Sequence, residues 1–370
     1  MCQDGLGNFD DDPAQGPRRK GGLLIVAKIL VTGGAGFVGS VCCAQLLRKG
    51  HQVVTVDNLS TGHPQAVPEG VVLYPNDIAD RDSVSNILRH QHFDAVFHFA
   101  AKALIPESVS NPGVFFDQNV ASGIAFLESL RAAGVNKFIF SSSAAVYGSP
   151  CAIPIEEDHP KNPVNSYGET KLMFERLLGW YAIAYGWTVY AFRYFNACGA
   201  TADAGEDHRP ETHIIPLLLE TAAGERPCFE VYGRDYPTPD GTCLRDYVHV
   251  LDIADAHLLA LNASNKVGMT AYNIGTGHSH SVLEVCGIVE NVTGTKLTLR
   301  DGSRRPGDPA VLCASPAKLQ RELGWKPRFS DLREIVQTAW EWKCRYPRGY
   351  ASGEPELTGH RRRSLSTVTP

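Results

Sequence analysis

Short apolar runs alternate with longer amphipathic segments over the first half of the chain. The apolar runs predict buried strands at Lys28–Thr32, Val53–Val56, Val71–Tyr74, Ala95–Phe99, Phe138–Ser141 and Thr188–Arg193. The longer segments predict helices, of which the clearest are Phe37–Arg48, Gly113–Ala133 and Tyr167–Tyr185. Strands that alternate with helices in this way form a parallel sheet covered by helices on both faces. The pattern therefore predicts a doubly wound parallel α/β sheet.

The sequence pattern of the chain changes after Asn196. Loops lengthen, prolines accumulate and the helical segments become shorter. We therefore expect a nucleotide-binding domain over 28–196 and a smaller α/β substrate-binding region over 197–347. The ends, 1–27 and 348–370, are polar and aperiodic, which predicts a disordered N-terminal extension and a disordered tail.

An apolar run near the N-terminus, Leu23–Val31, follows three basic residues and superficially resembles a signal peptide. It contains Lys28 and leads into a glycine loop instead of a cleavage site, so a buried first strand explains it better. No stretch approaches the ~18 apolar residues of a membrane helix. These features predict a cytoplasmic protein without a membrane partner.

Composition restricts the possible classes of function but does not indicate a particular reaction. The chain has 370 residues, of which 43% are apolar and 20% charged, enough for a full hydrophobic core. Its formal charge of −5 does not predict a nucleic-acid-binding surface. Among the ten cysteines, Cys42 and Cys43 are adjacent and the others are isolated, without a Cys-x-x-Cys pair or a Cys/His cluster. We expect reduced thiols and no metal site.

A glycine-rich loop lies between the first predicted strand and the first predicted helix. Gly34, Gly36 and Gly39 satisfy Gly-x-Gly-x-x-Gly, and Gly33 begins a related spacing. Such a loop lets the backbone approach a pyrophosphate at the helix N-terminus. Alone the pattern is weak, because a tight turn has the same signature. Its position after a strand favours a Rossmann-type dinucleotide site.

Acidic residues at the ends of the next two strands define the expected nucleotide. Asp57 ends the second predicted strand, where a carboxylate can hold the adenosine ribose diol. It is followed by Asn58 and Leu59 rather than arginine, so a ribose 2′-phosphate would meet a negative charge without a cation. The predicted cofactor is NAD rather than NADP. Asp77 and Ile78 are placed to reach the adenine, although an ordinary loop aspartate is an alternative.

The strongest chemical signal is Tyr167-Gly-Glu-Thr-Lys171. Residues four apart share one helical face, so the Lys171 ammonium can lie beneath the Tyr167 phenol. A free tyrosine titrates near ~10, and a neighbouring lysine together with a positively charged nicotinamide ring favours the phenolate and lowers its pKa. A serine run that includes Ser143 ends the preceding strand, and its hydroxyl can share a substrate oxygen with Tyr167. A surface lysine is the alternative, but the combination predicts a catalytic set of Tyr167, Lys171 and Ser143.

Motifs along nearly the whole chain resemble the UDP-glucose 4-epimerases, a family of extended short-chain dehydrogenases/reductases. The resemblance covers about residues 28–350, and its segments in the second region are more specific than the glycine loop. The motifs begin at Val31 (VTGGAGFVG), Asp57 (DNLSTG), His98 (HFAAK), Ser141 (SSSAAVYG), Tyr167 (YGETK), Arg193 (RYFN), Glu206 (EDHRPETH), Asp235 (DYPTPDGTCLRDY) and Arg304 (RRPGD).

The resemblance implies two sets of binding residues. The cofactor set is Gly33, Gly36, Phe37, Val38, Gly39, Asp57, Asn58, Leu59, Ser60, Asp77, Ile78, Phe99, Ala100, Ala101, Lys102, Gln118, Ser143, Tyr167, Lys171 and Phe195. The substrate set is Ser143, Tyr167, Asn196, His213, Tyr232, Arg245, Arg305, Asp308 and Leu312. Arginines suit the phosphate oxygens of a UDP-sugar because their forked donors match that geometry.

The implied reaction interconverts UDP-glucose and UDP-galactose, in galactose metabolism, through a transient 4-keto sugar. Tyr167 would take the proton of the 4-hydroxyl, Ser143 would orient the oxygen, and bound NAD would accept and return the hydride. The resemblance also implies a homodimer.

Three alternatives stay open in the sequence. A 4,6-dehydratase shares the cofactor loop, but such enzymes carry Asp-Glu where this chain has Ala144-Ala145. An epimerase of UDP-N-acetylglucosamine or UDP-xylose is harder to separate. Leu312, where a tyrosine narrows the sugar pocket in some relatives, would leave room for an acetamido group. A non-catalytic NAD-sensing regulator would not need Tyr167 and Lys171 together.

Overall fold

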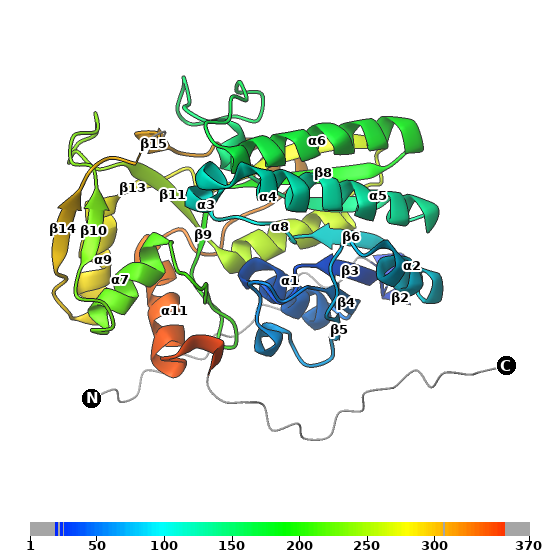
Figure 1. Ribbon diagram of the computed structural model, residues 1–370, viewed down its shortest axis with the longest axis horizontal. Coiled ribbons are helices and arrows are strands. Elements are labelled where there is room, and N and C mark those ends of the chain that lie inside the picture. The colour runs from blue at the N-terminus through cyan, green and yellow to red at the C-terminus, as the bar shows by residue number, and fades with distance from the viewer. Residues whose placement is uncertain (1–18, 21–22, 25, 306–307, 352–370) are drawn as a thin grey trace.

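The computed structural model describes residues 19–20, 23–24, 26–305 and 308–351. Their helices and strands form a large layered part and a smaller part beside it (Figure 1). Among the described residues, no helix has both the length and the apolar character needed to cross a bilayer.

Most of the two predicted disordered ends lies outside the described residues. Within the N-terminal end, β1 (Arg19–Lys20) pairs antiparallel with β2 (Leu23–Leu24). At the other end, η4 (Gly349–Ala351) is a short 3-10 helix.

A seven-stranded parallel sheet forms the centre of the larger part, in the order β12-β8-β7-β6-β3-β4-β5. Its strands are β3 (Lys28–Thr32), β4 (Gln52–Val56), β5 (Val72–Tyr74), β6 (Ala95–His98), β7 (Lys137–Ser143), β8 (Thr188–Tyr194) and β12 (Gly268–Ile274). The predicted Rossmann-type parallel sheet is confirmed. Chain order reverses between β3 and β6, and the crevice at the carboxyl ends of such strands is where open α/β sheets bind ligands.

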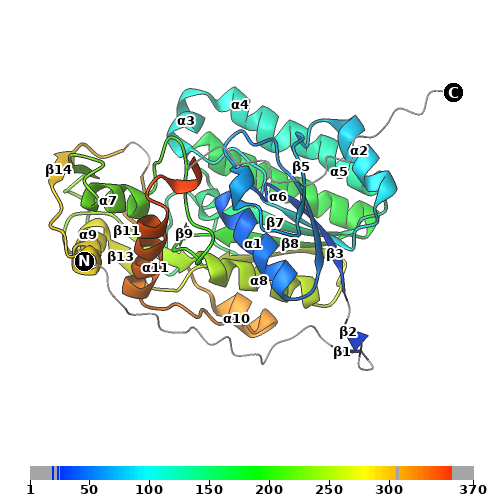
Figure 2. The same ribbon diagram turned by 90° about the horizontal axis from the view of Figure 1, so that it is seen from below.

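Helices cover both faces of this sheet, as Figure 2 shows. On one face, α1 (Phe37–Arg48) packs beside α8 (Val250–Asn262), and their apolar residues share a core with the strands. On the other face, α2 (Arg81–His90), α5 (Ser122–Ala132) and α6 (Ser166–Tyr185) form a second core. The apolar stripe of each helix is therefore buried against the sheet.

The smaller part gathers short strands and helices from residues after Asn196. Two strands, β10 (Phe229–Tyr232) and β14 (Leu299–Gly302), pair in parallel, and β11 (Leu244–His249) pairs with three others. Those partners and the neighbouring helices are β9 (Asn196–Cys198), β13 (Ser279–Ser281), β15 (Val311–Leu312), α7 (Ile214–Ala222), α9 (Val282–Thr293) and α11 (Leu332–Arg345). By contrast, α10 (Ala317–Leu323) packs against β12 and α8 of the larger part.

The chain crosses between the two parts more than once. After Asn196 it enters the smaller part, and it returns with α8 and β12 to complete the central sheet. The sequence analysis did not anticipate this exchange, because one strand pattern does not reveal which sheet it joins. The division at residue 196 therefore stays a prediction about folding units.

The helix predicted at Gly113–Ala133 is confirmed, and it contains a π-helical turn that the sequence pattern did not predict. It consists of α4 (Pro112–Phe116), a π-helical turn at η2 (Asp117–Ala121) and α5. Asn119 in the turn is buried and bonds the Lys102 backbone at 2.8 and 3.0 Å and the Thr170 hydroxyl at 3.0 Å. These tertiary bonds explain the wider turn, since π-turns often occur at functional positions.

A buried ion pair fastens α6 to the sheet. Arg193 on β8 donates to both carboxylate oxygens of Glu175 on α6, at 2.9 and 2.7 Å. Ser142 on β7 donates to the same carboxylate at 2.6 Å, and Arg193 also donates to the Tyr147 hydroxyl at 2.8 Å. Both charged side chains are 3% exposed. The pair has its charges and hydrogen bonds satisfied, a condition under which burial of two charges is tolerated.

We expect Glu175→Gln to destabilise the fold strongly. The substitution leaves the Arg193 charge buried without its counter-charge, which typically costs about 3–5 kcal/mol. The matched control is Glu128→Gln, which breaks the partly exposed pair with Arg131 and should cost below about 1 kcal/mol. Chemical unfolding followed by circular dichroism measures both. Equal effects of the two substitutions would show that the buried pair does not anchor α6.

Candidate active site

The glycine loop between β3 and α1 is pressed against the end of β6. Gly33 has a φ of +75°, and a Cβ there would lie 2.6 Å from the Ala100 nitrogen. A Cβ at Gly39 would lie 2.0 Å from the Gly33 carbonyl oxygen. Packing of the protein itself therefore requires glycine at both positions.

Gly36 is different, because the protein leaves room around it. A Cβ there would meet only the Gly33 oxygen, at 3.4 Å, which is ordinary contact. Gly36 is also the N-cap of α1, which has no side-chain cap and no acidic residue in its first turn. Uncapped backbone N–H groups at a helix N-terminus suit an anion. The loop thus fits the pyrophosphate of a dinucleotide, with Phe37, Val38 and Gly39 at the helix start.

Asp57 joins this loop to the segment after β4. Its carboxylate is buried and accepts from the Ala35 nitrogen at 2.9 Å and from the Leu59 nitrogen at 2.8 Å. The structure also brings Asn58 to Asp77, whose carboxylate accepts from the Asn58 amide at 2.8 Å. The residues predicted to surround the adenosine therefore lie together at the carboxyl ends of β4 and β5.

The segment after β6 forms the other wall of the crevice. Phe99 and Ala100 donate their backbone N–H groups to the Thr32 carbonyl at 2.9 and 3.1 Å, so this segment follows the glycine loop closely. The Lys102 ammonium lies 3.2 Å from the Glu107 carboxylate. Gln118 contacts its neighbour Asp117 at 3.4 Å. These contacts do not test a cofactor role for any of them.

The three predicted catalytic residues come from β7 and α6. Ser143 is the last residue of β7, and Tyr167 lies in the first turn of α6. A Cβ at Gly168 would lie 2.5 Å from the Ala145 carbonyl oxygen, so the start of α6 approaches the backbone just after Ser143. Asn165 caps α6 by accepting from the Gly168 nitrogen at 2.8 Å. Close packing and the cap together set Tyr167 beside Ser143.

Burial dominates the electrostatics of this set. Burial raises the pKa of Tyr167, and a hydrogen bond with Ser143 lowers it in part. Burial lowers the pKa of Lys171 to about 7, although Glu175 opposes that shift. The Lys171 ammonium donates to the Ser141 carbonyl at 2.7 Å and lies 5.8 Å from the centroid of the Tyr167 ring.

The sequence analysis expected Lys171, together with the positive nicotinamide ring, to lower the pKa of Tyr167, and this stays a prediction. In the protein without its cofactor, Lys171 is 3% exposed, and burial is the largest cause of both pKa shifts. A positive charge added beside the phenol favours its phenolate.

Residues predicted for the substrate lie on both sides of the crevice. Phe195 and Leu312 pack in one apolar cluster with Ala144 and Leu172, beside the catalytic set. Asn196 donates its side-chain amide to the Asp246 carbonyl at 2.8 Å. The Asp246 carboxylate, in turn, is buried and accepts from Thr276, Gly277 and Ala314 at 2.8–3.1 Å. Asp246 was not anticipated, since its role depends on three distant segments.

A second group lies in the smaller part. Arg245 on β11 forms an ion pair with Asp308, and its register partner on β15 is Leu312. The Arg305 guanidinium lies 4.1 Å from the centroid of the Tyr232 ring, within cation–π distance. Five predicted residues from three segments of the sequence are thus arranged around β10, β11 and β15, and their roles toward a UDP-sugar stay predictions.

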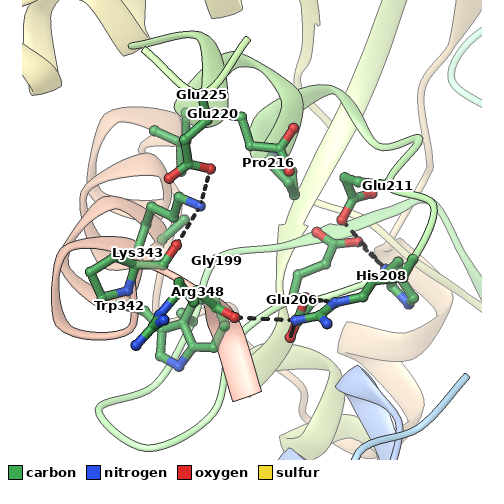
Figure 3. A pocket seen from close by; sticks show the side chains of 17 residues that line it. Gly199, Glu206, His208, Glu211, Pro216, Glu220, Glu225, Trp342, Lys343 and Arg348 are labelled. Carbon is green, nitrogen blue, oxygen red and sulfur yellow. Dashed lines mark hydrogen bonds and ion pairs between the residues drawn. The ribbon is translucent and has the colours of Figure 1, made fainter. Parts of the chain in front are cut away.

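His213 has other contacts than its predicted role requires. Its Nδ1 atom lies 2.8 Å from Glu206 and 2.9 Å from Glu211, at the N-cap of α7. Only its Nε2 atom remains available for a substrate. Figure 3 shows a pocket lined by Glu206, His208 and residues of α7 and α11; none of the predicted site residues lines it.

The comparisons with known proteins agree with this geometry. The chain matches the NAD dependent epimerase/dehydratase family over residues 29–275. It is 46% identical over 327 residues to the UDP-glucose 4-epimerase of Lacticaseibacillus casei, with 87% of this chain and 98% of that protein covered.

Two solved structures show the same fold. The UDP-glucose 4-epimerase of Brucella ovis, in complex with NAD, is 43% identical with a TM-score of 0.81, and the match covers 85% of this chain and 98% of that one. The enzyme of Bifidobacterium longum, in complex with NAD+ and UDP, is 36% identical with a TM-score of 0.84, covering 87% and 99%. This chain belongs to the NAD-dependent epimerase/dehydratase family.

Proposed function

We propose that this protein is a UDP-glucose 4-epimerase, which interconverts UDP-glucose and UDP-galactose with bound NAD. The observation that carries the proposal is that Ser143, Tyr167 and Lys171 converge at the carboxyl end of β7, in the same sheet whose β3 leads into the open Gly36 loop. Relatives that match over nearly their whole length bear the name of this enzyme. The decisive experiment is incubation of the purified protein with UDP-galactose and analysis of the nucleotide sugars formed.

NAD is the cofactor, and Asp57 supports its choice over NADP. The Asp57 carboxylate is buried at the end of β4, and the residues that follow it carry no positive charge. A 2′-phosphate placed there would be repelled without a compensating cation. When bound, NAD supplies a hydride acceptor for the sugar C4 and returns the hydride to the opposite face.

Tyr167 acts as the proton acceptor and donor for the sugar 4-hydroxyl, and Ser143 orients that oxygen. Because burial raises the pKa of Tyr167 in the protein alone, the positive nicotinamide ring contributes to stabilising its phenolate. Lys171 holds the nicotinamide ribose, and the same added groups change its own environment. Phe195 packs beside the nicotinamide, on the apolar side of the site.

The UDP group is held by the smaller part. Arg245 and Arg305 supply forked donors for the diphosphate, Tyr232 lines the uridine, and Asp308 holds the uridine ribose. In the protein alone Arg245 is paired with Asp308, so the two charges are already oriented before a substrate arrives. Many contacts to UDP and few contacts to the sugar allow the 4-keto sugar to rotate within the pocket and present its other face.

Two expectations remain predictions. Trp180 and Ile183 on α6 are 69% and 74% exposed, and a homodimer that buries this apolar face would remove them from water. The cytoplasmic location, too, rests on the sequence alone.

An epimerase of N-acetylated or pentose UDP-sugars remains the second candidate, because Leu312 rather than a larger residue borders the sugar.

We expect Tyr167→Phe to lower turnover of UDP-galactose by roughly 10²–10⁴-fold, the usual contribution of a general acid–base group. The ring stays in place, so bound NAD should be retained. Tyr185→Phe on the same helix, 49% exposed, serves as the control. Turnover near the wild-type rate in Tyr167→Phe would exclude Tyr167 as the base.

The openness around Gly36 generates a second prediction. Gly36→Ala should fold normally, because the new methyl group meets only the Gly33 oxygen at ordinary contact distance. It should weaken NAD binding by about tenfold or more, equivalent to ~1.4 kcal/mol, because the methyl group obstructs the pyrophosphate. Isothermal titration with NAD measures the change.

Gly179→Ala on α6 is the control, since a Cβ there meets nothing within 4 Å. Mass spectrometry of nucleotide released from the denatured wild type should find NAD. Undiminished NAD binding in Gly36→Ala, or NADP as the main released nucleotide, would contradict the cofactor assignment.

A third prediction concerns substrate breadth. Leu312 lies in the apolar cluster beside the catalytic set, and a leucine leaves more room beside the sugar 2-position than a tyrosine. We expect preference for UDP-glucose and UDP-galactose, with slower turnover of the N-acetylated forms, because contacts of this size discriminate by only ~1–3 kcal/mol. Leu312→Tyr should remove the N-acetyl activity and retain the hexose activity. A wild type inactive on UDP-N-acetylgalactosamine, or a variant that keeps this activity, would show that Leu312 does not control the acceptance of N-acetylated sugars.

A further inference from the structure

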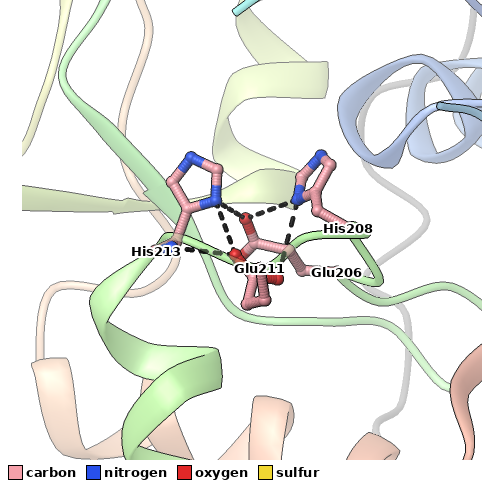
Figure 4. Close-up of side chains that lie close together, drawn as sticks. All are labelled: Glu206, His208, Glu211 and His213. Atoms are coloured by element: carbon pink, nitrogen blue, oxygen red, sulfur yellow. Dashed lines mark hydrogen bonds and ion pairs between the residues drawn. The ribbon is translucent and has the colours of Figure 1, made fainter. Parts of the chain in front are cut away.

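Four side chains with metal-binding groups converge between β9 and α7, and only one of them, His213, belongs to the predicted substrate set. They are Glu206, His208, Glu211 and His213, and one donor atom of each lies within 4.8 Å of the others. Figure 4 shows both imidazole rings directing Nδ1 toward the two carboxylates. Both carboxylate side chains are nearly buried, at 7% and 6% exposed.

The donor separations are close to those of a small tetrahedral cation without matching them. His213 Nδ1 lies 2.8 Å from Glu206 and 2.9 Å from Glu211, and His208 Nδ1 lies 3.3 and 3.7 Å from the same two carboxylates. Zinc binds imidazole nitrogen and carboxylate oxygen at about 2.0–2.2 Å, so the edges of its tetrahedron are roughly 3.3–3.5 Å. Coordination of one ion by all four donors therefore requires His213 to move outward and His208 to move inward.

Hydrogen bonds among the four groups account for the arrangement only incompletely. His208 Nδ1 is buried and makes no hydrogen bond of good geometry to any described residue. Two carboxylates packed together also require positive charge. A single divalent cation would balance the two carboxylates with both imidazoles neutral.

We propose that Glu206, His208, Glu211 and His213 form a structural zinc site. Two imidazoles and two carboxylates give a closed set of four ligands, which is typical of structural rather than catalytic zinc. Magnesium and calcium prefer six or more oxygen ligands, so the nitrogen donors disfavour them. The sequence analysis predicted no metal site because it searched for Cys-x-x-Cys pairs and Cys/His clusters, and these ligands are half glutamate.

At this position a bound ion would connect several segments of the chain. Asp207, between two of the ligands, accepts from His63 Nε2 through its carbonyl at 2.8 Å and from the Tyr350 nitrogen through its carboxylate at 2.9 Å. His63 belongs to the segment after Asp57, and His213 begins α7. Bound zinc would therefore hold the cofactor side, the smaller part and the C-terminal segment together. The pocket of Figure 3 includes three of the ligands and gives the ion a route from solvent.

The test uses the full-length protein after treatment with a chelator. Zinc content is measured by mass spectrometry of metals, and affinity by competition with a chromophoric chelator. We expect one zinc per chain, a higher melting temperature with zinc, and intense visible absorption of tetrahedral Co²⁺ when cobalt replaces zinc. His208→Gln and His213→Gln each remove a direct ligand. They should therefore weaken zinc binding by more than the ~10–100-fold that is typical when a residue hydrogen-bonded to a metal ligand is removed.

His280→Gln is the matched control, since His280 lies 3.8 Å from Glu284 in a pair away from the site. It should leave zinc content and the cobalt spectrum unchanged. If a histidine variant does not fold, Glu211→Gln and the cobalt spectrum of the wild type decide. A wild type that binds no zinc, or binding that survives His208→Gln undiminished, would overturn the proposal and leave two imidazolium–carboxylate pairs. None of these measurements depends on epimerase activity.

Discussion

The buried ion pair between Arg193 and Glu175 sets the position of the helix on which the proposed chemistry depends. Glu175 lies one turn after Lys171 on α6, and Arg193 lies on the neighbouring strand β8. Because the guanidinium holds both carboxylate oxygens, α6 cannot rotate or slide without leaving a charge unpaired. Tyr167, at the start of the same helix, is thereby held at a fixed height above the end of β7. The ion pair thus links sheet geometry to the site.

Fixing α6 in the interior has an electrostatic consequence. Lys171 becomes buried, and its pKa falls to about 7 even with Glu175 nearby. Tyr167 is buried as well, and its pKa rises. Both shifts come from burial, so a positive charge placed beside the phenol would favour its phenolate. In the proposed mechanism the protein provides position, and the nicotinamide of bound NAD would supply that charge.

Much of the larger part could be predicted from local pattern, and the reasons are visible in particular elements. Six of the central strands are short, largely apolar runs that alternate with helical segments, which is the arrangement of a parallel α/β sheet. The Tyr167/Lys171 pair depends only on spacing along one helix. The π-turn at Asp117–Ala121, by contrast, depends on Asn119 reaching Lys102 and Thr170. Likewise, β12 joins a sheet that its own residues do not identify, and the contacts of His213 depend on two glutamates brought together by the fold.

The two parts of the molecule have different proposed tasks in a reaction during which the sugar must rotate in its pocket. The cofactor side is closely packed, since the backbone leaves no room for a Cβ at Gly33 or Gly39 and Asp57 accepts hydrogen bonds from two loops. The smaller part is joined to it through Asp246, which connects Asn196 with the segments after β12 and β15. Its proposed UDP contacts are charged or aromatic, whereas the cluster that includes Phe195 and Leu312 is apolar. Directional bonds then hold the nucleotide, and an apolar wall offers the sugar few partners in either orientation, so both faces of C4 can be presented to the same hydride carrier.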